Sequence, residues 1–204
     1  LGLSREAFEE LSDHLYDNRY NSHEYRHLPS YRKSVEKGTV LIGETVIRGF
    51  PKIPRCLVLD EGIPQQFTTQ IAVEEKLNGY NVRVARVDGD VLAFTRSGIV
   101  CPFTTHTVRS LLDVDRFFDR HPDQMLCGAM IGPENPYTTA DCYDVDSIAF
   151  RAFDIRDRER GTPLPVMDRR EACEAFGIPQ AELFGVFEPA EAVDATPAIV
   201  RDLD

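Results

Sequence analysis

Alternating apolar and polar side chains predict a pair of strands near the middle of the chain. The first strand is predicted over Ile71–Leu77, a tight turn at Asn78-Gly79, and the returning strand over Tyr80–Val87. Because alternate residues of a strand share a face, Glu74 and Lys76 lie together, and so do Asn81 and Arg83. We therefore expect a carboxylate, a lysine, an amide and a guanidinium to converge beside one hairpin turn.

Further elements are predicted on both sides of this hairpin. Ser4 is placed to cap a helix that runs to about Tyr16, and the polar segment Asn18–Tyr31 is predicted to be a loop. The strand Ile148–Ile155 should turn Phe150, Ala152 and Asp154 to one face and Arg151, Phe153 and Ile155 to the other. The remaining elements are a hairpin over 39–47, a strand over 91–95 after an Asp88-Gly89 turn, helices near 106–112 and 114–120, a strand over 125–131, and helices over 168–176 and 196–203.

Antiparallel hairpins joined by helices predict an α+β fold. Residues 1–65 are predicted to form a small N-terminal module that precedes the candidate catalytic residues. Residues 66–204 then form the domain that carries the central hairpin, with two antiparallel sheets flanked by helices.

Composition narrows the class of protein. The 204 residues are 42% hydrophobic, contain no apolar run long enough to cross a bilayer, and start without a charged-then-apolar leader, so we expect a cytoplasmic protein with no membrane partner. The five cysteines are widely spaced and form no Cys-x-x-Cys pair, which argues against a zinc ribbon or a disulfide framework. A net charge of −11 argues against a uniformly basic, phosphate-gripping surface but is compatible with a local basic groove.

Lysine is scarce, since the chain has 19 Arg and only 4 Lys, and Lys76 is therefore conspicuous. A lysine amine becomes a good nucleophile once its pKa is lowered by burial or by neighbouring cations. The alternative interpretation is a solvated lysine at the end of a hairpin. His23 and His27 are a second candidate constellation, but no third ligand is spaced to complete a metal site with them.

The string Lys76-Leu77-Asn78-Gly79 resembles the Lys-x-Asp-Gly nucleophile motif of covalent nucleotidyltransferases, the superfamily of DNA and RNA ligases and mRNA capping enzymes. The longer string Glu74–Arg83 is similar to a narrower group, the archaeal-type homodimeric ATP-dependent RNA ligases. Asn78 replaces the commoner Asp, and Asn81 stands where the superfamily has an Arg. Three further segments resemble the same group: Ile47–Ile53, Thr95–Thr105 and Gly132–Tyr137. Phe153-Asp154-Ile155 resembles the third motif of the wider superfamily.

The resemblance implies a role for each matching residue. Lys76 would be the catalytic nucleophile and Glu74 an adenine-side contact. Ribose or phosphate would be held by Asn81, Arg83 and Arg96. Phe153 would stack on adenine, and Asp154 would lie close to a metal ion. One position departs from the group, because Ala129 stands where the group has a glutamate that contacts the ribose, and Glu134 is too far along the chain to replace it.

The resemblance also implies the fold and the reaction. The fold would be that of the ligase/capping-enzyme nucleotidyltransferases, and the reaction would use ATP and Mg²⁺ (or Mn²⁺) for adenylation and joining of RNA 5′-phosphate and 3′-hydroxyl ends, as in RNA repair. The group's later lysine-containing strands have no match after Asp154, and no lysine follows Lys76. We therefore expect a truncated chain with little activity, monomeric although its full-length relatives are homodimeric. The alternatives are a degenerate paralogue that binds nucleotide or RNA ends without catalysis, and a DNA ligase.

Overall fold

The computed structural model describes residues 1–32, 34–133, 135 and 143–202. Two compact units make up this part of the chain. The first unit combines Leu1–Pro51 with Asn78–Gln180, and the second combines Lys52–Leu77 with the chain from Ala181 onward. This division differs from the expected boundary at residue 65, because residues 1–51 share an apolar core with strands that follow residue 78.

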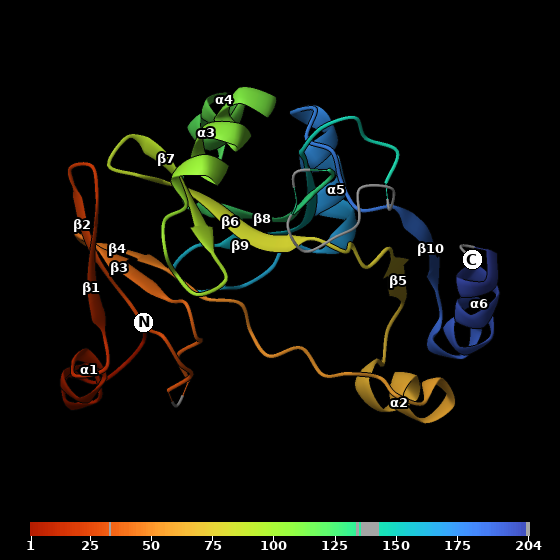
Figure 1. The fold of residues 1–204 in the computed structure, drawn as a ribbon. Coiled ribbons are helices and arrows are strands. Elements are labelled where there is room, and N and C mark those ends of the chain that lie inside the picture. The colour runs from red at the N-terminus through yellow and green to blue at the C-terminus, as the bar shows by residue number, and fades with distance from the viewer. Residues whose placement is uncertain (33, 134, 136–142, 203–204) are drawn as a thin grey trace. The chain divides into compact units, whose positions relative to one another are not determined.

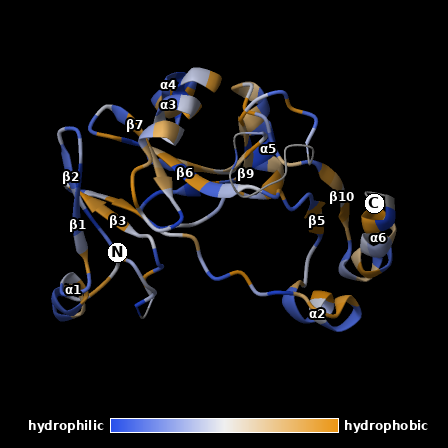
Figure 2. Ribbon diagram, viewed as in Figure 1, coloured by the Kyte–Doolittle hydropathy of each residue, from blue (hydrophilic) through white to orange (hydrophobic). Residues whose placement is uncertain are grey.

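A four-stranded antiparallel sheet forms the N-terminal part of the first unit, in the order β1-β2-β3-β4. Helix α1 precedes it, and Ser4 caps this helix by accepting a hydrogen bond from the Ala7 amide. The bounds are α1 Arg5–Ser12, β1 Tyr16–Tyr20, β2 His23–His27, β3 Val40–Ile42 and β4 Thr45–Ile47. Figure 2 shows that the β1–β2 hairpin is mainly hydrophilic whereas β3 is hydrophobic.

The expected loop over Asn18–Tyr31 is wrong, because much of this segment forms β1 and β2. Asn21 takes a left-handed conformation (φ 51°) that lets the chain reverse between the two strands. The predicted hairpin over 39–47 is confirmed as β3 and β4, with Gly43 at φ 54° in its turn.

The central sheet of the first unit has the antiparallel order β7-β6-β8-β9. Its strands are β6 Tyr80–Val87, β7 Asp90–Thr95, β8 Gln124–Ile131 and β9 Ala149–Asp157. β-branched Val82, Val84 and Val87 favour the extended strand β6, and the Asp88-Gly89 turn that leads to β7 is confirmed, with both residues at positive φ.

The two faces of the central sheet are buried against different partners. Three helices cover one face, which we call the helix face (Figure 1). They are α3 Pro102–Leu111, α4 Val114–Arg120 and α5 Val166–Ala175. The other face, which we call the module face, packs on Tyr25, Val40, Ile42, Ile47 and Phe50 of residues 1–51.

Two predicted helices of the first unit start earlier in the chain than expected. Helix α3 begins at Pro102, because proline is well suited to the first turn of a helix, where its missing N–H is not needed. Helix α5 begins at Val166, two residues before the expected start at 168, and no side chain caps it. Asp168 instead lies in the first helical turn, where its negative charge is favoured by the helix dipole.

Arg83 connects the module face to residues 1–51. Its side chain is fully buried, and its guanidinium donates to the backbone carbonyls of Gly38 (2.7 Å), Thr95 (3.1 Å) and Arg48. The guanidinium carbon lies 5.5 Å from the centre of the Phe50 ring. Burial lowers the pKa of Arg83 to about 10. This value is still well above neutral pH, so the guanidinium stays charged. One side chain thus satisfies carbonyls from three separate segments.

The expected pairing of residues 71–77 with 80–87 is wrong. Strand β5 (Ile71–Glu74) pairs with β10 (Leu183–Phe187), and β6 pairs with β7 and β8. Asn78 and Gly79 are absent from the described residues with positive φ, so they do not form the left-handed turn that an Asn-Gly pair favours. A Cβ atom at Gly79 would instead lie 2.3 Å from the carbonyl oxygen of Met130, so glycine is needed for a close approach to β8.

The second unit joins the β5–β10 sheet to two helices, α2 (Leu59–Gln66) and α6 (Pro189–Asp202). Contacts between α2 and α6, and between α6 and both strands, hold this unit together. Helix α6 begins seven residues before the expected Thr196 and continues through Pro197. No helix in the described part of the chain is long and apolar enough to cross a bilayer.

A Gly79→Ala substitution should lower the free energy of unfolding by about 1–3 kcal/mol, because the added methyl group overlaps the β8 backbone. Urea denaturation followed by circular dichroism measures this change. The matched control is Gly89→Asn, at an open turn position with φ 89° that asparagine tolerates. Equal stability of the two variants would contradict the close-approach explanation.

Replacing Arg83 should be far more destabilising than replacing a surface arginine. Arg83→Ala leaves three carbonyls without their donor, and at about 1 kcal/mol or more for each it should cost about 3 kcal/mol or more. Arg83→Lys should recover little, because an ammonium lacks the planar fork that reaches three acceptors. Arg160→Ala, at an exposed turn, should change stability by less than about 0.5 kcal/mol in the same urea titration. Full stability of Arg83→Lys would refute this role.

Candidate active site

The module face becomes polar toward one end of the central sheet. Strand register aligns Arg83, Cys127 and Asp154 in one row across β6, β8 and β9. Directly opposed residues share a face of an antiparallel sheet. The next row, formed by Asn81, Ala129 and Arg151, therefore lies on the same face, and we call it the Asn81 row. The candidate site is built on this polar end of the module face.

A β-bulge lies between the two rows. Cys127 pairs with Asp154, but the adjacent Gly128 pairs with Ala152, so Phe153 is an extra residue without a partner on β8. Such a bulge interrupts the alternation of side chains and re-aims them. The expected alternation along β9 is therefore wrong at this point: Phe150, Ala152 and Ile155 enter the helix-face core, whereas Phe153 packs against the module-face core and Asp154 lies opposite Cys127 of that core.

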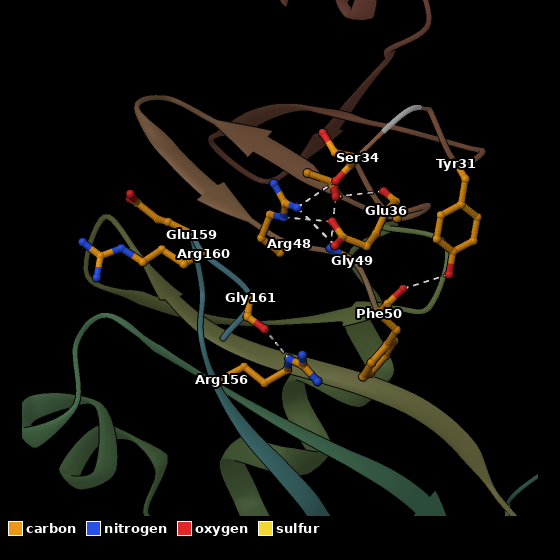
Figure 3. Close-up of polar contacts among 12 residues, drawn as sticks. Tyr31, Ser34, Glu36, Arg48, Gly49, Phe50, Arg156, Glu159, Arg160 and Gly161 are labelled. Atoms are coloured by element: carbon orange, nitrogen blue, oxygen red, sulfur yellow. Dashed lines mark hydrogen bonds and ion pairs between the residues drawn. The ribbon is translucent and has the colours of Figure 1, made fainter. Parts of the chain in front are cut away.

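Phe153 is partly exposed and packs against Phe50, with ring centres 5.9 Å apart and planes inclined by 39°. Figure 3 shows how the segment behind this ring is held. The Tyr31 hydroxyl donates to the Phe50 carbonyl (2.9 Å), and Arg48 donates to the Ser34 carbonyl (3.0 Å) and pairs with Glu36. The Phe153 ring thus has a fixed apolar backing and a partly accessible surface, as a base-stacking platform requires.

Asp154 is engaged by a neighbouring arginine. Its carboxylate lies 2.7 Å from an Arg156 guanidinium nitrogen, and its side chain is 20% exposed. Burial raises the pKa of Asp154 above its ordinary value, and the charge of Arg156 opposes this rise. Arg156 also donates to the Gly161 carbonyl (2.8 Å), which holds its guanidinium in place (Figure 3).

The described side chains do not fit a metal site made by protein ligands alone. Among the residues that the structure describes, no three His, Cys, Asp or Glu side chains are grouped to hold an ion. Asp154 is a single carboxylate that already pairs with Arg156. His23 instead lies 2.9 Å from Asp90, and His27 lies 2.6 Å from the Asn18 amide. The metal role of Asp154 therefore stays a prediction.

Lys76 and Glu74 belong to the second unit, where Glu74 ends β5 opposite Leu183 and Lys76 is exposed in the segment that follows. The Glu75 amide donates to the Glu182 carbonyl (2.9 Å), which continues the β5–β10 pairing almost to Lys76. The chain returns to the first unit at Asn78, two residues after Lys76.

Arg96 and Arg83 differ sharply in exposure. Arg96 is exposed in the turn after β7, which Gly98 completes with φ 91°. Arg83 is buried, and its donors reach backbone carbonyls. In this conformation the guanidinium of Arg83 is engaged by backbone carbonyls inside the core. A contact between Arg83 and a nucleotide stays a prediction.

Sequence reasoning missed two described residues. The Tyr143 hydroxyl accepts a hydrogen bond from the Asn78 amide within the nucleophile motif, and Arg151 stands opposite Ala129. Only strand register, which the bulge sets, could have identified Arg151. Asn135 is buried and donates to the Met130 carbonyl (3.1 Å), whereas Glu134, Pro136 and Tyr137 of the resembling segment lie outside the described residues.

Solved structures match the whole described architecture. Two forms of an archaeal ATP-dependent RNA ligase are each 39% identical to this chain, with TM-scores of 0.90 and 0.92. The matches include 97% and 99% of this chain but only 54% and 56% of the ligase chains. A putative ATP-dependent DNA ligase from Aquifex aeolicus is 28% identical with a TM-score of 0.89, and 56% of it is covered. The expected α+β fold of ligases and capping enzymes is therefore confirmed.

Sequence comparison gives the same result. An uncharacterized protein of Methanocaldococcus jannaschii is 41% identical over 179 residues, which are 84% of this chain and 45% of that protein. The chain thus spans about half the length of the relatives it matches. Residues 69–202 match the RNA ligase family, and the chain belongs to this family.

Proposed function

We propose that this chain provides the adenylation part of an ATP-dependent RNA ligase that joins RNA 5′-phosphate and 3′-hydroxyl ends. The observation that carries the proposal is the likeness to archaeal ATP-dependent RNA ligases over nearly the whole chain, which includes the segment of Lys76 and the polar end of the module face.

The reaction begins with attack of the neutral Lys76 amine on the α-phosphorus of ATP. A nitrogen–phosphorus bond forms, the bond from the α-phosphorus to the bridging oxygen breaks, pyrophosphate leaves and the amine loses a proton. The adenylate then passes to an RNA 5′-phosphate, and an RNA 3′-hydroxyl displaces AMP as the strand is sealed. Covalent capture of the adenylate divides one difficult phosphodiester synthesis into easier steps.

The other site residues bind and orient the nucleotide in this proposal. Phe153 stacks on the adenine, with its far side supported by Phe50. Asn81 and the exposed Arg96 hold ribose or phosphate, and Glu74 contacts the adenine side. Because the described carboxylates do not form a metal site, we assign no step to a metal ion, and the use of Mg²⁺ or Mn²⁺ rests on the resemblance.

Two alternatives have specific support. The likeness to a putative DNA ligase at 28% identity favours sealing of DNA rather than RNA as a second candidate. Ala129, at a position where the resembling group has a glutamate, favours a protein that binds nucleotide or RNA ends without catalysis.

Covalent labelling tests the nucleophile. When the protein that contains this chain is incubated with α-labelled ATP and magnesium, denaturing electrophoresis should show label, and Lys76→Ala should reduce it by about two orders of magnitude or more. Lys37→Ala is the matched lysine control and should keep the label. Label that survives Lys76→Ala would overturn the assignment of the nucleophile. An unlabelled protein that still binds ATP would favour the non-catalytic alternative.

Nicked duplexes separate the two ligase candidates. A duplex whose nick is flanked by RNA ends should be sealed at least about tenfold faster than the same duplex with DNA ends. Gel electrophoresis of end-labelled strands measures both rates. Faster sealing of the DNA nick would favour the DNA ligase alternative and contradict the RNA assignment.

A further inference from the structure

Arg151 differs from the other arginines in the strands of the central sheet. Arg83 donates to three carbonyls, Arg86 pairs with Asp115 and Asp119, and Arg156 pairs with Asp154. Within the described part of the chain, the hydrogen bond of Arg151 is a long one, 3.3 Å, to the carbonyl of its own neighbour Phe150. Its side chain is partly exposed, so the guanidinium has donors available at the edge of the candidate site.

The register explains why no carboxylate engages Arg151 from across the strand. Its partner on β8 is Ala129, a buried methyl group, and the partner of Ala129 on β6 is Asn81. Opposed α-carbons lie about 4.5–5.5 Å apart, and a carboxylate at position 129 would be well placed to pair with the guanidinium. The carboxylate in the adjacent row, Asp154, is already paired with Arg156.

The Asn81 row therefore offers donors and no acceptor charge. The two outer side chains start about 10 Å apart, two strand spacings, and both are partly exposed. An arginine fork matches the oxygens of a phosphate and can bind two of them at once, and an asparagine amide supplies further N–H donors. A phosphate group is the ligand chemistry that this combination fits.

We propose that Arg151, together with Asn81, forms a phosphate-binding subsite on the module face. This inference rests on the proposed function, which supplies two sources of a phosphate at this place, the ATP and the 5′-phosphate of the RNA. Arg151 acts as a binding residue whose charge is left for the ligand because position 129 is alanine.

Binding measurements with paired ligands test the subsite. Four ligands are compared by titration calorimetry or fluorescence anisotropy: ATP, adenosine, and one oligoribonucleotide with either a 5′-phosphate or a 5′-hydroxyl. Arg151→Ala should weaken binding of a phosphorylated ligand by about tenfold and leave its unphosphorylated counterpart unchanged. Arg151→Lys should recover part of the loss, and Arg160→Ala, an exposed turn arginine, should have no effect.

The four ligands also identify the source of the phosphate. A loss confined to ATP assigns the subsite to the nucleotide, and a loss confined to the 5′-phosphorylated strand assigns it to the RNA end. For the RNA, the slope of log Kd against log salt concentration should fall by about one. Arg151→Gln keeps the length of the side chain without its charge and should bind like Arg151→Ala, with thermal denaturation confirming that both variants fold.

Three results would overturn the proposal. Unchanged affinity of Arg151→Ala and Arg151→Gln for both phosphorylated ligands would refute the subsite alone, as would an equal loss for phosphorylated and unphosphorylated ligands. If the parent protein bound neither ATP nor RNA, the proposed function would fail together with the subsite. Labelling at Lys76 combined with an inert Arg151 would leave the proposed function standing.

Discussion

The buried guanidinium of Arg83 holds together segments that are distant in the sequence. It reaches carbonyls of Gly38 and Arg48 from residues 1–51 and of Thr95 from β7, while its own strand β6 lies at the centre of the main sheet. A buried charge is costly unless hydrogen bonds compensate it, and the three carbonyls that accept from the terminal guanidinium nitrogens of Arg83 hold residues 1–51 against the module face. Arg83 also lies over the Phe50 ring, and Phe50 packs against Phe153, so the same side chain helps to position Phe50 next to Phe153. The stacking platform of the candidate site therefore depends on an interaction that contacts no ligand.

Local sequence signals were sufficient where the partner lies close in the chain. The β6–β7 hairpin and the β3–β4 hairpin follow from short turns with residues suited to positive φ. The same reasoning failed for β5, whose partner β10 begins 109 residues later. The Asn78-Gly79 pair has the composition of a tight turn, but Gly79 is required by the nearby Met130 carbonyl. A turn signal therefore does not distinguish a reversal of the chain from a close approach of two backbones.

The candidate site shows the same limit at the level of single residues. Lys76, Asn81, Arg96, Phe153 and Asp154 were predicted from a resemblance of motifs, and strand register then places Asn81, Phe153 and Asp154 on one face of the sheet. A period of two residues would have set Phe153 and Asp154 on opposite faces. The single extra residue in β9 brings both to the module face and aligns Arg151 with Ala129. Alternation places Arg151 on the same face as Phe153, but its alignment with Ala129 and Asn81 depends on the bulge, which no alternation rule predicts.

The central claim is that the polar end of the module face binds ATP. A crystal structure of the protein with α,β-methylene-ATP tests it most directly, because a methylene bridge prevents transfer of the adenylate and traps the bound nucleotide. The account predicts the adenine ring against Phe153 and a phosphate within hydrogen-bond distance of the Asn81 row. A nucleotide bound elsewhere, such as the cavity of about 230 Å³ between α1 and the segment of Tyr31 and Val35, would contradict it.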